Sequence, residues 1–145
     1  MMHTGRLVAL GALLLVSFAA VARDDVGTYP LADVFGNPEY AQRLEGVKFF
    51  FGKQPHPAVA RSFGEYQSNK KTNAFNKSDK EACEWAFLSA LVSFHQRALS
   101  QGGDAVINIR YNYRQQPFSS ETEFQCGAGN TVAGVTVLGT VVKLK

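Results

Sequence analysis

The sequence predicts an α+β fold, in which an antiparallel-rich sheet packs on one long central helix and a short helical segment comes first. Two observations support this prediction. A helix is expected from about residue 78 to 101, because Ser78 and Glu81 form an S-x-x-E capping box and Gly102-Gly103 can supply the left-handed residue that closes a helix. The stretches on both sides of it are rich in short apolar runs and alternating patterns that are typical of strands. Strands, then a helix, then strands is an α+β plan.

The central helix is apolar over well over half of its circumference when the side chains are placed at about 100° per residue. A helix of this kind must lie across a sheet and be covered in part from a second side. The remaining polar stripe contains Ser89 and Ser93, with the small Ala82 and Ala86 beside it, and it offers a surface for a partner helix or a second subunit. The apolar positions are Cys83, Trp85, Phe87, Leu88, Ala90, Leu91, Val92, Phe94, Ala98 and Leu99.

Residues 1–22 have the pattern of a secretory signal peptide. Arg6 gives the positive n-region, an apolar h-region follows, and Ala20-Val21-Ala22 is an A-x-A cleavage site. A membrane anchor is the alternative, but the apolar run is roughly fourteen residues and a bilayer needs ~20. The first cysteine is Cys83, so no lipid-anchoring cysteine stands at the cleavage point. We expect a periplasmic chain, cleaved after Ala22, without a stable membrane anchor.

The rest of the chain is predicted to form one domain by its length, with no repeat or low-complexity run. We expect a helical extension over residues 23–46 and a core domain over 47–145. Asn37-Pro38-Glu39 is a good helix start, because it combines an Asn cap, a proline at the first helical position and an acid near the positive end of the helix dipole. This segment is a candidate for the second cover on the central helix. The net charge of +3 is small, so it is weak support for a polyanion and we expect no nucleic-acid partner.

Before the central helix, residues 47–51 contain three consecutive phenylalanines and predict a buried strand. Two closely spaced prolines in the following loop exclude regular sheet there. A second strand is predicted from residue 62 to about 71. Residues 69–80 are interpreted as a polar approach to the helix, with Phe75 docked on the core.

After the central helix, residues 105–113 alternate like a half-buried antiparallel strand. A turn is expected over 115–120, a short strand over 122–126 and another turn over 127–130. Residues 132–144 have valines on both faces, which predicts a central strand and the longest one.

The mature chain contains two cysteines, Cys83 and Cys126. In an exported protein two such cysteines are expected to pair with each other. Free thiols and metal ligands are the alternatives, and no C-x-x-C spacing supports a metal.

Four stretches of the chain, residues 69–79, 83–91, 103–109 and 122–129, resemble a family of small exported bacterial proteins that is commonly labelled "excinuclease ATPase subunit". The block from 102 to 109 and the last strand are also similar to YbjQ-like proteins and, distantly, to the outer-membrane lipoprotein that senses stress for the Rcs pathway. This resemblance implies a small α+β domain with a helix packed on a sheet. It implies no characterised activity.

The sequence does not support the ATPase activity in that label. ATP binding of this kind needs G-x-x-x-x-G-K-[ST], in which backbone amides hold the phosphates and the lysine neutralises them. The glycine-rich stretch Gly127-Ala128-Gly129-Asn130 lacks the lysine and the hydroxyl residue, and it precedes a strand. We therefore predict that the protein is not an ATPase.

No residue is predicted to be catalytic, and no metal or other cofactor is expected. His56 and His95 have no cysteine or carboxylate at ligand spacing, and Ser89 and Ser93 lack an acid–base pair. Carboxylates gathered by the fold would make the chain an enzyme acting on an envelope component, which is the alternative function. The glutamates that could pair in this way are Glu65, Glu81, Glu84, Glu121 and Glu123.

The remaining candidate is a lysine- and asparagine-rich stretch before the helix N-terminus. Cations and free amides at such a place can hold an anion; the alternative is a solvated loop whose asparagines hold turns. We predict a non-enzymatic binding or interaction module of the cell envelope, with an envelope protein or an anionic ligand as its partner. The candidate residues are Asn69, Lys70, Lys71, Asn73 and Lys77.

Overall fold

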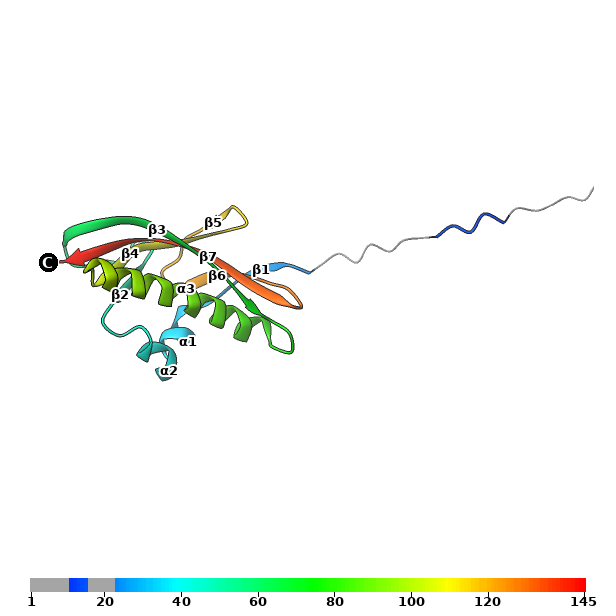
Figure 1. Ribbon diagram of the computed structural model, residues 1–145, viewed down its shortest axis with the longest axis horizontal. Helices are drawn as coiled ribbons and strands as arrows, with labels where there is room; N and C mark the ends of the chain where they lie inside the picture. The colour runs from blue at the N-terminus through cyan, green and yellow to red at the C-terminus, as the bar shows by residue number, and fades with distance from the viewer. Residues whose placement is uncertain (1–10, 16–22) are drawn as a thin grey trace, which may run out of the picture.

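The computed structural model describes residues 11–15 and 23–145, so most of the expected signal peptide lies outside the described residues. Within them the fold is α+β, as predicted: a curled seven-stranded sheet, close to a half-barrel, wraps around one long helix (Figure 1). The strands are β1 (Asp25–Pro30), β2 (Lys48–Phe51), β3 (Val59–Asn73), β4 (Ala105–Tyr113), β5 (Gln116–Phe118), β6 (Glu123–Ala128) and β7 (Val132–Leu144), and the helices are α1 (Leu31–Phe35), α2 (Pro38–Gln42) and α3 (Asp79–Gln101).

The last strand, β7, is the centre of the sheet. β3 pairs antiparallel with it from Asn73↔Val132 to Val59↔Leu144. On the other edge of β7, β4 pairs with its C-terminal half and β6 with its first residues. β2 and β5 continue the sheet beyond β4, and β1 continues it beyond β6; the β2–β4 pair alone is parallel among the described strands. The central position of β7 is confirmed, although β3, with 15 residues, is longer than the 13 residues of β7.

Helix α3 begins and ends where the sequence predicts. The Ser78 hydroxyl accepts a hydrogen bond from the Glu81 amide at 3.1 Å, and Gly102 closes the helix at φ 81° in the left-handed region. Two details of its surface were predicted wrongly. Ala82 and Ala86 are fully buried and do not form an exposed surface beside the serines, and Leu99, expected in the core, is 53% exposed.

An aromatic cluster fills the space between α3 and the sheet. Phe87 of α3 stacks on Phe124 of β6 with ring centroids 4.1 Å apart, and it also contacts Tyr111 of β4 and Phe51 of β2. Stacked and tilted aromatic pairs add to the free energy that their burial provides. One helical residue therefore joins three strands that are far apart in the sequence.

The predicted disulfide between Cys83 and Cys126 is present, with Cα atoms 5.8 Å apart. Both residues are fully buried. The bond joins the second turn of α3 to the middle of β6, so it links the helix covalently to the sheet.

The N-terminal segment covers α3 from a second side, as expected, but it is not helical throughout. Tyr40 of α2 packs edge-on against Trp85 of α3 at 5.4 Å, and His95 Nε2 lies 2.7 Å from the Glu45 carbonyl oxygen. The helical extension expected over residues 23–46 needs correction, because its first part is strand β1. β1 lies on the outer edge of β6 and gains its backbone partners there.

Four other expectations are corrected around the sheet. Residues 69–73 belong to β3, so the polar approach to the helix is much shorter than expected. Phe75 in that approach is 63% exposed and does not dock on the core. The expected turn over 115–120 contains the short strand β5, and β6 continues to Ala128 in what was expected to be a turn.

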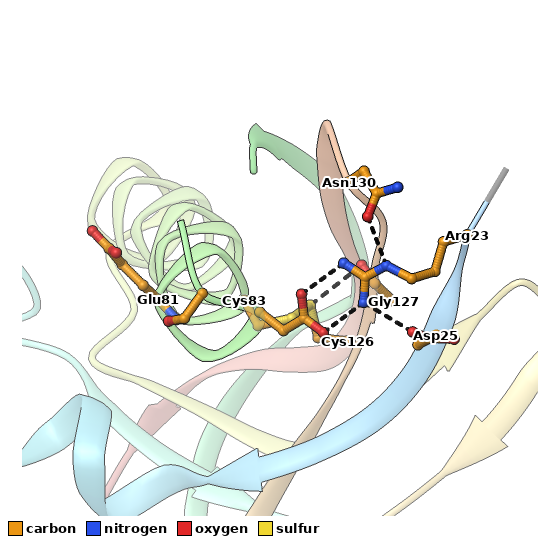
Figure 2. A network of polar contacts seen from close by, with 9 residues as sticks. Arg23, Asp25, Glu81, Cys83, Cys126, Gly127 and Asn130 are labelled. Carbon is orange, nitrogen blue, oxygen red and sulfur yellow. Dashed lines mark hydrogen bonds and ion pairs between the residues drawn. A yellow bond between two sulfur atoms is a disulfide. The ribbon is translucent and has the colours of Figure 1, made fainter. Parts of the chain in front are cut away.

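Arg23, the first residue after the expected cleavage point, ties three elements together at one end of the molecule (Figure 2). Its guanidinium donates two hydrogen bonds to the carboxylate of Asp79, at 2.8 and 2.9 Å, and one each to Asp25 and Asn130. Because Asp79 is the first residue of α3 and Asn130 lies in the β6–β7 turn, the N-terminus of the folded chain is fastened to both. We call these four residues the Arg23 clamp.

Candidate functional site

A large hollow lies on the face of the sheet opposite α3. It has a volume of about 820 Å³ and is formed by β3, β7 and the β4–β5 turn. We call it the polar groove. Its lining residues are Gln67, Asn69, Lys70, Lys71, Asn112, Tyr113, Arg114, Gln115, Gly134, Val135 and Thr136.

Strand alternation decides which β3 side chains reach the polar groove. Tyr66 points to the helix side, because its ring packs on Phe94 and its hydroxyl lies 2.9 Å from that of Ser93. Successive side chains of a strand point to opposite faces, so Gln67, Asn69 and Lys71 point to the groove side. A hydrogen bond of 3.3 Å from Gln67 Nε2 to Asn69 Oδ1 orders the two amides.

The rim of the groove is a two-residue turn between β4 and β5. Arg114 and Gln115 have φ values of 48° and 60°, so both are left-handed, as a type I′ hairpin requires. Neither is the asparagine or glycine that such a turn normally has, and left-handed conformations are costly for other residues. Buried Gln125 of β6 holds the turn at both ends: its Oε1 accepts from the Tyr113 amide and its Nε2 donates to the Gln116 carbonyl.

One wall of the groove is the ring of Tyr113, which lies over two paired glycines. Gly127 and Gly134 are register partners in β6 and β7. A Cβ atom on Gly127 would overlap the Tyr113 ring, and one on Gly134 would come within 3.2 Å of it. The two glycines therefore provide the space in which the ring lies, and the Tyr113 hydroxyl donates to Asp24 at 3.2 Å.

The charged side chains that line the groove are all positive: Lys70, Lys71 and Arg114. Arg114 is paired with Asp24, and its hydrogen bond to the Tyr113 hydroxyl, with the charge of Asp24, raises its pKa above the usual value. Neither lysine has a carboxylate within ion-pair distance among the described residues. By the same alternation that places Tyr66 on the helix side, the Lys70 side chain points toward α3. Of the charged side chains that the structure describes here, Lys71 is therefore the cation without an ion pair that a negatively charged ligand would meet in the groove.

The lining of the groove also contains a buried acceptor. The Asn112 side-chain oxygen is buried and has no hydrogen-bond partner in the described part of the chain. The atom is covered by the protein's own atoms, so it is a cost within the fold and not an acceptor that is open to a ligand. The accessible hydrogen-bonding groups of the groove are the side-chain amides of Gln67, Asn69 and Gln115, and together with the cations they suit a ligand that carries both a negative charge and hydroxyl groups.

The structure divides the five residues that the sequence suggested for anion binding. Asn69, Lys70 and Lys71 line the groove, whereas Asn73 and Lys77 close the β3–α3 connection. The Asn73 side chain accepts from the Phe75 amide at 2.9 Å, and Lys77 Nζ donates to the Asn73 carbonyl at 3.0 Å. Asn73 and Lys77 therefore stabilise a turn, which was the alternative to anion binding. The candidate residues that line a hollow lie on a strand of the sheet and not at the N-terminus of α3.

A smaller depression of about 420 Å³ lies on the other side of β3, between this strand and α3. We call it the edge notch. Lys70 and Lys71 line it together with Trp85, Ser89 and Ser93. The two serines are half-buried: Ser93 contacts the Tyr66 hydroxyl, and the Ser89 hydroxyl donates to the Trp85 carbonyl.

The remaining candidates take part in local structural contacts. His56 Nδ1 contacts the Pro57 carbonyl oxygen. Among the glutamates, Glu65 pairs with Arg110 at 2.6 Å, and Glu84, whose pKa is raised by burial, lies 3.9 Å from Lys80. In residues 11–15 and 23–145 no cluster of three or more His, Cys, Asp or Glu side chains could hold a metal ion.

The groove residues that sequence reasoning missed come from three strands and one turn. Asn112 and Tyr113 are contributed by the end of β4, Arg114 by the β4–β5 turn, and Thr136 by β7. The positive φ values of the turn and the pairing of the glycines were not visible in the sequence. The one sequence signal was the glycine content of β7.

Comparisons with known proteins leave the family open: no protein-family model matches the chain, and neither does any curated protein or solved structure. Across the described ranges, no helix combines the length and the apolar character needed to cross a membrane.

Proposed function

We propose that this chain is an exported, non-enzymatic binding module of the cell envelope, and that its polar groove holds an anionic ligand with hydroxyl groups, such as a phosphorylated or acidic sugar. The observation that carries the proposal is the lining of the groove, in which every charged side chain is positive and the amides of Gln67, Asn69 and Gln115 lie beside the cations. The volume of about 820 Å³ is within the usual range of small-molecule sites, roughly 300–1,000 Å³.

The buried disulfide supports the location. Cys83 and Cys126 are oxidised in the fold, and disulfides persist in oxidising compartments such as the periplasm. The proposed export rests on this bond and on the signal-peptide pattern of residues 1–22. Intact-mass analysis of the exported protein tests it: a chain that begins at Arg23 is expected, and a retained Met1 would overturn it.

The lining favours binding over catalysis. No carboxylate or imidazole lines the groove, and these are the groups used most often in general acid–base catalysis. The carboxylate-dependent enzyme therefore stays the second candidate, without a specific observation in its favour.

The test is an NMR titration of the exported protein with glucose 1-phosphate, inorganic phosphate and uncharged glucose. We expect the sugar phosphate to shift the amide signals of Lys71, Asn112 and Arg114 most, phosphate to shift them less, and glucose to have little effect. Lys71→Ala should weaken binding several-fold, because one cation is lost from the groove. Lys53→Ala, which removes an exposed lysine outside the groove, is the matched control.

Three results would decide against the proposal. Equal binding of glucose and glucose 1-phosphate would show that the negative charge is not recognised. Equal effects of Lys71→Ala and Lys53→Ala would show that the ligand does not bind in the groove. Release of inorganic phosphate from the sugar phosphate in the same sample, seen by ³¹P NMR, would favour the enzyme.

A further inference from the structure

The second long strand of the sheet, β3, has a free edge. Its only strand partner among the described residues is β7. Outside that ladder, its backbone is engaged by side chains at Gly64, whose N–H donates to the Ser62 hydroxyl, and at its last residue, Asn73, whose carbonyl accepts from Lys77. Between these points every outward N–H and C=O lacks a partner in the described part of the chain. Edges of this kind are templates for pairing with another strand.

The usable part of this edge is regular and has definite limits. The register between β3 and β7 shifts between Ser62 and Glu65, where Gly64 has φ 92°, and it is continuous from Glu65 onward. The bulge and the left-handed glycine therefore end the straight segment at Glu65. The segment from Glu65 to Lys71 contains no proline and no glycine, so nothing in it prevents a further ladder.

The charges of this segment select one way for the strand to pair with a second copy of itself. When the strand pairs antiparallel with a second copy of itself, one residue of β3 can lie opposite the same residue of the other copy, on the two-fold axis. Only then do the groove-side residues of one copy lie opposite the groove-side residues of the other. An axis at Ser68 places Lys71 of each copy opposite Glu65 of the other, on the groove face. An axis at Asn69 places Glu65 opposite Asn73, and an axis at Lys70 places two lysines opposite each other. Glu65 is the one acidic residue of β3 and already pairs with Arg110 of its own chain. The axis at Ser68 is therefore the register that gives Lys71, which has no ion pair in the described ranges, an acidic partner.

A second, independent observation points to the same residue. Ser68 is 2% exposed, and its hydroxyl has no hydrogen-bond partner in the residues that the structure describes. On an axis at Ser68 the two serines are direct cross-strand neighbours, about 4.5–5.5 Å apart at Cβ. Because each hydroxyl is covered by its own chain, it would have to turn toward the strand edge to reach the other, and there the two would satisfy groups that now lack a partner in the described residues.

We propose that two copies of this chain associate by antiparallel pairing of their β3 edges about a two-fold axis at Ser68. The ladder from Glu65 to Lys71 would add roughly six to eight backbone hydrogen bonds. The two sheets become continuous, the edge notches with their half-buried Trp85 and Ser89 meet on the helix side, and the two polar grooves lie on one common face. An extended segment of another protein is the competing occupant of the edge.

The test measures self-association of the exported protein by sedimentation velocity over a wide concentration range, without added ligand. Lys71→Glu places two glutamates opposite each other at both ends of the ladder, so dimerisation should weaken by at least about tenfold. Glu65→Lys/Lys71→Glu exchanges the charges and should restore it. Lys53→Glu makes the same change in charge outside β3 and is expected to leave dimerisation unchanged.

A zero-length carbodiimide crosslink supplies a second readout. Lys71 and Glu65 are six residues apart on one strand, about 20 Å, so they cannot be joined within a chain. A crosslinked peptide that joins them must therefore come from two copies, and we expect mass spectrometry of the dimer to find it. A chain that stays monomeric at the highest concentrations would overturn the proposal. The proposal would also be overturned if both charge variants dimerised as strongly as the parent protein and the crosslink between Lys71 and Glu65 were absent.

Discussion

Removing the disulfide should lower stability by an amount that the structure allows us to estimate. The bond joins residues 43 positions apart, and a loop of this length corresponds to about 4 kcal/mol on the chain-entropy model. Cys83→Ala/Cys126→Ala is the suitable change because both sites are fully buried, and serine would leave hydroxyl groups unpaired there. For a domain of this size, a loss of 4 kcal/mol corresponds to a fall in Tm of about 15 °C.

Thermal unfolding followed by circular dichroism measures this effect. The parent protein under reducing conditions is the matched control, since it keeps both sulfur atoms and loses only the bond, and it should melt close to the double variant. Both should show the far-UV spectrum of the oxidised parent before they unfold, because the bond constrains the unfolded chain more than it shapes the native one. A double variant that melts within about 2 °C of the oxidised parent would refute the entropic argument.

Three further predictions concern the groove and the Arg23 clamp. Gly127→Ala places a methyl group where the Tyr113 ring lies, so chemical denaturation should show a loss of about 1–3 kcal/mol, part of which Gly127→Ala/Tyr113→Ala recovers; an unchanged midpoint would contradict the steric argument. The hydrogen bonds from Arg23 lower the pKa of Asp79, so their stabilisation is complete above the ordinary carboxyl pKa of about 3.9 and is lost as the pH falls through the lower folded-state value. Arg23→Ala should therefore melt below the parent at about pH 6 and converge with it at about pH 2, whereas a constant difference would exclude this linkage. Glucose 1-phosphate should weaken dimerisation, because Lys71 cannot serve the ligand and the second copy at once; sedimentation with and without the ligand measures this, and unchanged dimerisation would show that the two sites do not share the lysine.

The parts of the fold that were predicted correctly are those whose signals are local. Ser78 and Gly102 mark the ends of α3 by capping chemistry that involves only their own neighbours. Strand β4 was recognised from its short apolar–polar pattern, but its strict alternation was wrong, because a bulge at Asn108 (φ 51°) puts Ile107 and Ile109 in different apolar clusters. The valines on both faces of β7 reflect its central place. The disulfide was predictable because the chain beyond residue 22 has two cysteines, which offer one pairing.

The parts that were missed depend on partners far away in the sequence. Strand β1 contains a glycine and ends in a proline, and it is a strand because the outer edge of β6, about a hundred residues later, pairs with it. The polar end of β3 has weak strand preference, and β7 holds it in the sheet. The polar groove follows the same rule, since β3, β7 and the β4–β5 turn each supply a part and no single motif encodes it.

The Arg23 clamp bears on when the proposed cleavage after Ala22 would take place. In the folded protein, Arg23 is fastened to Asp79 and Asn130, and Asp25 already belongs to β1 (Figure 2). A protease that needs an extended chain on both sides of the bond would meet one only before these contacts form. If the chain is exported as proposed, we therefore expect cleavage to precede the pairing of β1 with β6, and a chain that folds early would protect its own leader from removal.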